Sequence, residues 1–352
     1  MIYKVFIDGA EGTTGLRLRE RLSGRTEIEL LEIAEADRKD ISARKALIRD
    51  ADVSFLCLPD EGAREIVRAI DAEVCAGGPD SPFAKVRIID ASTAHRVRSG
   101  WVYGMPELYR GENRGGGEAD ETPIARAGRV ANPGCHATGF ILSVRPLVRA
   151  GLLPADARLA CHSLTGYSGG GKRMIAEYEA AAAEKDRNPD FVPLSSAPRQ
   201  YGLGQAHKHL PEMAAYAGLS EAPVFAPVVS NFYSGLLVSV PLDGGLLSKA
   251  SGENTGPGSG LKGRIHEALS YYYRKCPLVK VREMGYDPEG GFLSAAAMAG
   301  RDDLEIIVTG TDERVEIVSR CDNLGKGAAG AAIQNMNIML GLPEETGLVM
   351  GA

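Results

Sequence analysis

Short apolar runs alternate with polar stretches of helical spacing through the first third of the chain. The runs at residues 2–7, 28–34, 51–58 and 86–90 are typical of strands buried on both faces of a parallel sheet. Apolar residues at helical spacing follow the first run, and a further helix is expected at 63–72. This alternation of strand and helix predicts a doubly wound parallel sheet.

The pattern changes in the second half, where strand-like runs follow one another with fewer helices between them. Helices are expected at 173–185 and 261–275, and another near the end at 331–340. The strands predicted here lie at 158–164, 224–229, 236–242, 305–309 and 315–321. Adjoining strands predict a mixed or antiparallel sheet with helices on one face, an α+β arrangement. Loops are expected at 111–121, 166–172 and 251–260.

Composition indicates a globular protein of two domains, with 352 residues, 44% of them apolar and 24% charged. The net charge of −6 argues against a nucleic-acid or anionic-membrane partner, and no apolar run is long enough to span a bilayer. The first residues read as a strand rather than a signal peptide. The six cysteines are too widely spaced for redox or zinc motifs, which predicts reduced thiols, a cytoplasmic location and no bound metal.

A glycine-rich turn, Gly9-Ala-Glu-Gly-Thr-Thr-Gly15, separates the first strand from the first helix. There Gly9 permits a tight turn, Gly12 lets backbone N–H groups approach a pyrophosphate, and Gly15 lets helix and strand pack closely. The spacing differs from the common dinucleotide fingerprint, and an ordinary turn between strand and helix is the alternative. We predict a Rossmann-type dinucleotide-binding domain.

Charged residues after the second strand bear on the choice of dinucleotide. A carboxylate about twenty residues beyond the glycines would favour NAD through the ribose 2′-hydroxyl, whereas arginine accommodates the 2′-phosphate of NADP. Both kinds occur between Glu35 and Asp40, where Arg38 and Lys39 favour NADP(H). A solvated charged loop is the alternative reading.

The stretch Ala131–Gly139 is the best candidate for the chemistry. Cys135 follows a Pro-Gly turn and precedes an apolar run of helical spacing. A thiol at a helix N-terminus is stabilised as a thiolate by unpaired N–H groups and the helix dipole. A buried structural cysteine is the alternative, but the small residues around it favour a reactive thiol.

A histidine pair, His207 and His209, supplies the best candidates for proton transfer. With a dinucleotide and a reactive thiol, they suggest aldehyde chemistry through a thioester on Cys135. On a strand the two rings would share a face, and on a helix they would not. Each could instead be a hydrogen-bonded structural histidine. His136 is expected to line the site.

These motifs resemble those of the N-acetyl-γ-glutamyl-phosphate reductases, in the spacing of the shorter of that family's two types. The resemblance covers nearly the whole chain. It is carried by the glycine turn, by Asn132-Pro-Gly-Cys135 with Ala137-Thr-Gly139, and by His207-Lys-His-Leu-Pro-Glu212. It implies NADPH-dependent reduction of N-acetylglutamyl 5-phosphate to the semialdehyde, with release of phosphate, in arginine biosynthesis. His136 departs from the family's usual tyrosine or phenylalanine.

The resemblance also assigns site residues. The nucleophile falls on Cys135, and the acid/base histidine falls on His207 or His209. It places the glycine-rich segment 166–172 at the substrate. The expected cofactor contacts are Gly9, Gly12, Thr13, Thr14, Gly15, Arg38, Lys39, Ser92, Gly325 and Lys326. The expected substrate contacts are Asn132, Lys172 and Arg173, with Arg199 competing for the same anionic groups. Resemblance to the wider superfamily adds Arg96 near the acyl phosphate, for which a surface arginine after a strand is the alternative.

Resemblance to the wider superfamily, which includes aspartate-semialdehyde and glyceraldehyde-3-phosphate dehydrogenases, implies a discontinuous first domain. Residues 1–134 with 322–352 would bind the dinucleotide. Residues 135–321 would form the catalytic and oligomerisation domain of a homodimer or homotetramer.

Other functions are also compatible with these motifs. The nearest are reductases of aspartyl phosphate or of a carrier-bound aminoadipyl phosphate, although the Pro-Gly before Cys135 is unusual in the aspartate enzymes. A cysteine hydrolase independent of nicotinamide and a non-catalytic dinucleotide sensor are more distant alternatives.

Overall fold

The computed structural model describes residues 1–112, 122–188, 190–246 and 260–351. The chain divides into two compact units, which are described separately. The first comprises residues 1–106, 118–133 and 328–348, and the second comprises residues 107–117, 134–327 and 349–352. Among the described residues, no helix has the length and apolarity needed to cross a membrane.

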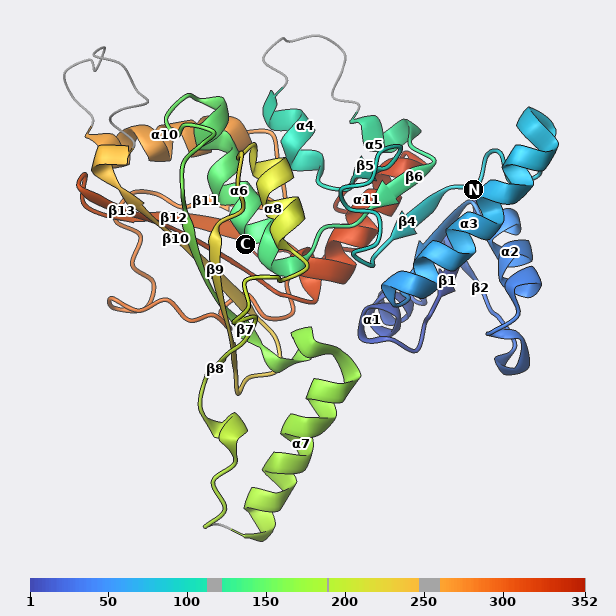
Figure 1. The fold of residues 1–352 in the computed structure, drawn as a ribbon, viewed down its shortest axis with the longest axis horizontal. Helices are drawn as coiled ribbons and strands as arrows, with labels where there is room; N and C mark the ends of the chain where they lie inside the picture. The colour runs from blue at the N-terminus through green and yellow to red at the C-terminus, as the bar shows by residue number, and fades with distance from the viewer. Residues whose placement is uncertain (113–121, 189, 247–259, 352) are drawn as a thin grey trace. The chain divides into compact units, whose positions relative to one another are not determined.

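The first unit is built on a six-stranded sheet in which all neighbours are parallel (Figure 1). The strand order is β2-β1-β3-β4-β6-β5. Every residue of β3 and β4 is buried, so helices and loops cover both faces of the sheet. The order reverses between β1 and β3, and ligands of such sheets bind at the carboxyl ends of the strands at that point. The bounds are β1 Tyr3–Asp8, β2 Ile28–Leu31, β3 Val53–Leu56, β4 Ile88–Asp90, β5 Val102–Tyr103 and β6 Arg129–Ala131.

Most helices of the first unit lie between its strands in sequence, whereas α11 follows the last strand of the second unit. Helices α2 and α3 enclose a core with Phe6, Leu56 and Ile88 from the sheet. Helix α11 packs against β3 and β4. The bounds are α1 Thr13–Leu22, α2 Ile41–Asp50, α3 Asp60–Gly77, α5 Pro123–Arg126 and α11 Gly330–Leu340, with α4 Pro106–Glu112 starting at its edge.

A buried ion pair fixes the end of β1. Arg44 of α2 donates from Nε and Nη2 to Oδ2 of Asp8, at 2.9 and 2.7 Å. Both side chains are almost fully buried. Burial raises the pKa of Asp8 above its ordinary value, and the bonds from Arg44 oppose that shift. The pair anchors α2 beside the turn that follows β1.

The second unit contains a seven-stranded mixed sheet, which confirms the predicted α+β arrangement. The strand order is β11-β12-β13-β10-β7-β9-β8, with parallel pairing only between β11 and β12 and between β7 and β9. The bounds are β7 Ala160–Gly166, β8 Arg199–Gln200, β9 Val224–Ser230, β10 Leu236–Asp243, β11 Val279–Val281, β12 Leu304–Gly310 and β13 Arg314–Cys321.

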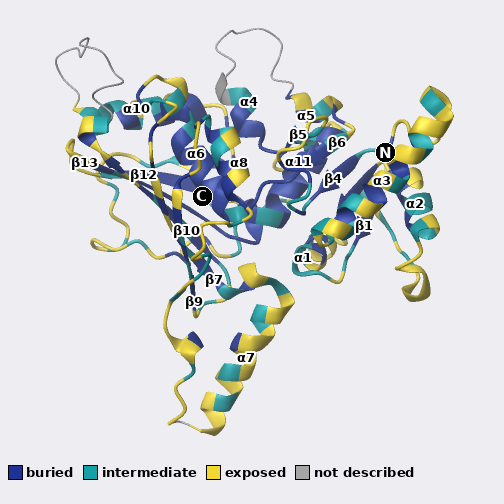
Figure 2. Ribbon diagram, in the orientation of Figure 1, coloured by how far each residue is buried: buried dark blue, intermediate teal, exposed yellow. Residues whose placement is uncertain are grey.

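Helix α6 (Cys135–Arg149) lies at the centre of this unit. It packs on β10 and β13, and α8 (Leu210–Ala217) and α10 (Leu261–Tyr273) pack against it. Figure 2 shows α6 buried along its length, whereas α7 (Gly171–Arg187) is largely exposed. The Tyr273 hydroxyl of α10 donates to the Leu142 carbonyl of α6 at 2.6 Å, which ties the two helices together.

Several predicted segments differ from the structure. Strand β2 ends at Leu31 rather than residue 34, and α3 is longer than the predicted 63–72. The segment predicted as a flexible loop at 166–172 is a 3₁₀ turn, Tyr167–Gly170, followed directly by the start of α7. Glycines lower the propensity for regular structure, but packing of this turn against α7 overrides it. Most of the loops predicted at 111–121 and 251–260 lies outside the described residues.

A substitution at Gly15 tests the tight turn after β1. An added Cβ would lie 2.5 Å from the Gly9 carbonyl oxygen and 2.8 Å from Ala10 Cα, so the backbone must move. We expect Gly15→Ala to lower the free energy of unfolding by about 1–3 kcal/mol in urea titrations. Gly24→Ala, where no atom lies within 4 Å of the added Cβ, is the matched control. Equal effects of both substitutions would contradict this reading of the turn.

Candidate active site

Cys135 is the first residue of α6, as the sequence predicts. Gly134 caps the helix with extended backbone, and its carbonyl accepts from the Thr138 N–H at 2.8 Å to close the first turn. The Cys135 side chain is partly exposed. Its thiol therefore meets unpaired N–H groups and the positive end of the helix dipole, which favour the thiolate.

A π-helical turn, Gly325–Ala329, approaches the same thiol from the end of the second unit. A Cβ on Gly327 would lie only 2.7 Å from the Cβ of Cys135. This glycine-rich segment before α11 is helical rather than an open turn. Glycine is required at 327 because the turn approaches Cys135 so closely.

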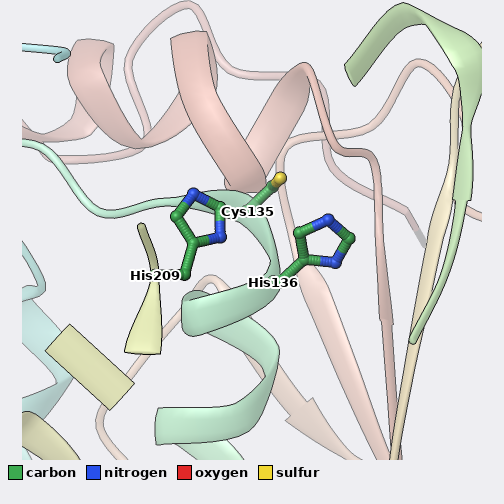
Figure 3. Close-up of side chains that lie close together, drawn as sticks. All are labelled: Cys135, His136 and His209. Carbon is green, nitrogen blue, oxygen red and sulfur yellow. The ribbon is translucent and has the colours of Figure 1, made fainter. Parts of the chain in front are cut away.

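Three side chains with reactive atoms gather at the start of α6. Cys135, His136 and His209 each offer one sulfur or nitrogen atom, and these atoms lie within 4.8 Å of one another. Figure 3 shows the thiol flanked by the two imidazole rings, which come from different segments. The group has the components of a nucleophile and its proton-transfer partner.

His207 and His209 lie in a turn immediately before α8, so neither the strand nor the helix considered from sequence is correct. Their rings meet edge to face, with centroids 4.7 Å apart. The His207 ring lies 5.8 Å from that of His136, centroid to centroid. The His209 N–H donates to His207 Nδ1 at 3.2 Å. The turn thus brings both histidines to the site, which spacing alone did not determine.

Glu212 links the start of α6 to the histidine turn. It is 1% exposed, and its Oε2 accepts from the Gly134 N–H at 3.2 Å. Its Oε1 lies 4.0 Å from Nε2 of His209. Sequence reasoning gave Glu212 no role, although its position three residues after His209 at a helix start was the available signal.

His136 is held as a neutral imidazole. Its Nδ1 lies 2.7 Å from the Ser163 hydroxyl and its Nε2 lies 2.7 Å from the Tyr201 hydroxyl. Burial first, and then the positive charge of His207, lower the pKa of His136 to about 3. Burial and negative charge at Cys135 raise the pKa of Tyr201. No sequence spacing pointed to Ser163 or Tyr201.

The glycine turn in the first unit fits a dinucleotide. Gly9 has φ +86°, and a Cβ there would lie 2.4 Å from the Cys57 carbonyl oxygen. Gly12 caps α1, and the buried Oγ1 of Thr13 has no hydrogen-bond partner in the structure. The helix N-terminus and this unsatisfied hydroxyl suit pyrophosphate oxygens. A cavity of about 220 Å³ adjoins the turn.

Only some of the other predicted cofactor residues lie at this cavity. Arg38 lines the cavity beside the glycine turn, whereas Lys39 is exposed and does not line it. The Ser92 hydroxyl donates to Asp90 at 2.8 Å. Gly325 belongs to the π-helical turn, and the buried Lys326 ammonium donates to Glu107 at 2.6 Å.

The predicted substrate residues also fall into two sets. Lys172 and Arg173 are exposed in the first turn of α7. Arg96 and Asn132 are buried in the first unit, where Arg96 Nε donates to the Asn132 carbonyl at 2.9 Å. The Asn132 amide donates to the Ala328 carbonyl at 3.0 Å and accepts from Asn335 at 3.1 Å. Those bonds tie the chain just before Cys135 to the start of α11.

Comparison with known proteins is consistent with this geometry. The family model for the semialdehyde dehydrogenase NAD-binding domain matches residues 4–115, and the model for the dimerisation domain matches residues 135–323. Aspartate semialdehyde dehydrogenase II from Vibrio cholerae has the same fold, with a TM-score of 0.62 and 15% identity over 97% of this chain and 98% of that one. The chain is therefore a semialdehyde dehydrogenase in fold and domain composition.

Curated relatives define the family more narrowly. N-acetyl-gamma-glutamyl-phosphate reductase 2 of Nostoc sp. is 42% identical over 98% of this chain and 99% of its own length. The N-acetyl-gamma-glutamyl-phosphate reductase of Brucella ovis is 41% identical over 96% of this chain and 99% of its own length. The chain belongs to the N-acetyl-gamma-glutamyl-phosphate reductase family.

Alkylation rates test the reactivity of the helix-tip thiol. We expect iodoacetamide at pH 7 to modify Cys135 faster than the other thiols, as followed by peptide mass spectrometry. Burial raises the pKa of four of them, Cys57, Cys161, Cys276 and Cys321. Cys75 is exposed and is the internal standard. Equal rates at Cys135 and Cys75 would show that the helix start does not activate the thiol.

The stability of the protein at mildly acidic pH tests the neutral state of His136. Its folded-state pKa of about 3 lies below the ordinary value of 6.5, so only the unfolded chain takes up a proton between these values. The contribution of the neutral His136 to the free energy of unfolding is fully present above pH 6.5 and is lost as pH falls towards 3. Between pH 7 and pH 5, we expect the free energy of unfolding of the wild type to fall by about 2 kcal/mol more than that of His136→Phe, as measured by urea titration.

His162→Gln, which alters an exposed histidine on β7, is the control for this measurement. It should follow the wild type at both pH values. Parallel pH dependence of the wild type and His136→Phe would contradict a buried neutral His136.

Proposed function

We propose that this protein reduces N-acetyl-L-glutamyl 5-phosphate with NADPH, giving N-acetyl-L-glutamate 5-semialdehyde and phosphate in arginine biosynthesis. The observation that carries the proposal is the thiol of Cys135 at the start of α6, grouped with His209 within 4.8 Å. The relatives that bear this enzyme's name align over nearly all of the chain.

The reaction begins at Cys135. Its thiolate attacks the acyl carbonyl, a C–S bond forms, the C–O bond to phosphate breaks, and phosphate leaves with the electron pair. NADPH, when bound, supplies the hydride that reduces the resulting thioester. The hemithioacetal then collapses to the aldehyde, and the sulfur leaves as the thiolate that began the cycle. Positive charge at the helix start stabilises that thiolate at both stages.

His209 is the proposed acid and base. Its ring is within reach of the thiol, so it can take the proton from Cys135 and later protonate the oxygen of the hemithioacetal. It takes this proton back when the hemithioacetal collapses to the aldehyde and the sulfur leaves as the thiolate. The Glu212 carboxylate, 4.0 Å from Nε2, can stabilise the imidazolium that forms between these steps. His207 accepts a hydrogen bond from the His209 backbone and supports the turn.

The anionic groups of the substrate need cations. Lys172 and Arg173 are proposed for this role, because both are exposed at the start of α7 and close to the glycine turn 167–170. Arg96 and Asn132 remain proposed contacts, which would require exchange of their present internal hydrogen bonds. Arg199 is already paired with Glu177 at 2.8 Å and is the weaker candidate.

The matched families support the domain roles that we propose. We propose that the first unit is the dinucleotide-binding domain and the second the catalytic and oligomerisation domain, close to the predicted bounds of 1–134 with 322–352 and 135–321. A homodimer or homotetramer is proposed because the second unit matches a dimerisation domain. A cytoplasmic location is proposed because the cysteines are free thiols.

Substrate choice separates this proposal from its nearest rivals. In the reverse direction we expect phosphate-dependent reduction of NADP⁺ with N-acetylglutamate semialdehyde, measured by absorbance at the nicotinamide band. The kcat/KM with aspartate semialdehyde should be lower by about 100-fold or more, because a site built for a polar group rejects an analogue that lacks it. A higher kcat/KM with aspartate semialdehyde would overturn the proposal.

Cys135→Ser provides the control for the mechanism. It should remove turnover by several orders of magnitude, because a serine hydroxyl is a much weaker nucleophile near neutral pH. Binding of NADP⁺ should be unchanged. Retained turnover would point to another nucleophile, whereas NADP⁺ binding without turnover in the wild type would favour a dinucleotide sensor.

A further inference from the structure

The cavity of the first unit beside the glycine turn carries an unusual set of charges. Its volume is about 220 Å³, and it lies at the carboxyl ends of β1 and β2. Its charged lining residues are Asp8, Glu11, Arg19, Glu32 and Arg38. Only two of these, Arg19 and Arg38, are cations.

The position of Glu32 is the first informative feature. Because β2 ends at Leu31, Glu32 is the first residue beyond the strand and stands twenty residues after Gly12. In dinucleotide folds a carboxylate at this place binds the ribose 2′-hydroxyl of NAD and repels the 2′-phosphate of NADP. The charges at 35–40, to which the sequence pattern pointed, lie farther along the chain. Glu32 by itself would favour NAD.

Arg19 alters that expectation. It lies on α1, lines the same cavity, and its Nη2 forms an ion pair with Glu32. Arg38 forms a second pair with Glu11 of the glycine turn, at 3.2 Å. The remaining carboxylate, Asp8, is bound to Arg44 outside the cavity lining. Each carboxylate of the cavity is therefore neutralised by an arginine.

We propose that Arg19 determines the choice of coenzyme. Its guanidinium cancels the charge of Glu32 and joins that of Arg38 in binding the 2′-phosphate of NADP(H). The proposal rests on the NADPH dependence of the proposed function. Guanidinium groups bind phosphate oxygens in pairs of hydrogen bonds. Both ion pairs are partly exposed, and exposed pairs are weak, so a phosphate dianion can replace the carboxylates.

Calorimetric binding without substrate tests the proposal. NADP⁺, NAD⁺ and 2′,5′-ADP are titrated into the wild type, Arg19→Met and Arg17→Met. We expect Arg19→Met to weaken NADP⁺ and 2′,5′-ADP binding by roughly tenfold or more, the effect of losing a charged hydrogen bond. NAD⁺ binding should stay the same or strengthen, because Glu32 is then available to the ribose. Arg17, which pairs with Glu20 on the same helix, is the matched control and should change neither.

A second variant separates the two roles of Arg19. Arg19→Met with Glu32→Gln should recover part of the NADP⁺ affinity, because the repulsive charge is gone, and should lose the gain in NAD⁺ binding. Equal weakening of NADP⁺ and NAD⁺ by Arg19→Met, or an equal effect of Arg17→Met, would overturn the proposal. Circular dichroism checks that all three variants fold.

The two proposals fail in different ways. If the wild type binds NADP⁺ as expected but does not turn over N-acetylglutamate semialdehyde, the proposed function is wrong and the role of Arg19 stands. If turnover occurs and the ratio of NADP⁺ to NAD⁺ affinities is the same in Arg19→Met and the wild type, the role of Arg19 is wrong and the function stands.

Discussion

The hydrogen bond from the Gly134 N–H to Glu212 is the contact on which the candidate site depends. It joins the residue before the nucleophile to the start of α8, and the turn that carries His209 leads into that same helix start. A buried carboxylate needs partners, and here the partner is a backbone donor that helix geometry leaves unpaired. One contact therefore holds the start of α6, with the Cys135 thiol, beside the turn that carries His209.

The two histidines near that contact lie in different electrostatic surroundings. Both ring nitrogens of His136 lie at hydrogen-bond distance from hydroxyls, and burial keeps the ring uncharged, although the residue is next to Cys135 in sequence. His209 faces the same thiol with a carboxylate 4.0 Å from its ring. The two histidines have nitrogen atoms within 4.8 Å of the same sulfur, but their surroundings differ, because one lies between neutral hydroxyls and the other lies beside a carboxylate.

Periodicity and turn chemistry predicted both sheets, the glycine turn and the helix that starts at Cys135, because these depend on local sequence. They did not predict the hydrogen bonds to His136 from Ser163 on β7 and from Tyr201 just after β8. They also placed the end of β2 three residues too late, which hid the position of Glu32. Such errors arise where long-range packing, rather than propensity, decides where an element ends or which residues meet.

The close approach of Gly327 to Cys135 has a consequence for how related chains are interpreted. The Cβ of any other residue at 327 would overlap that of Cys135, while leaving the signature around Asn132–Gly139 untouched. A homologue could therefore keep every residue by which the family is recognised and still be a pseudoenzyme. A glycine nearly two hundred positions away in sequence belongs to the signature as much as the cysteine does.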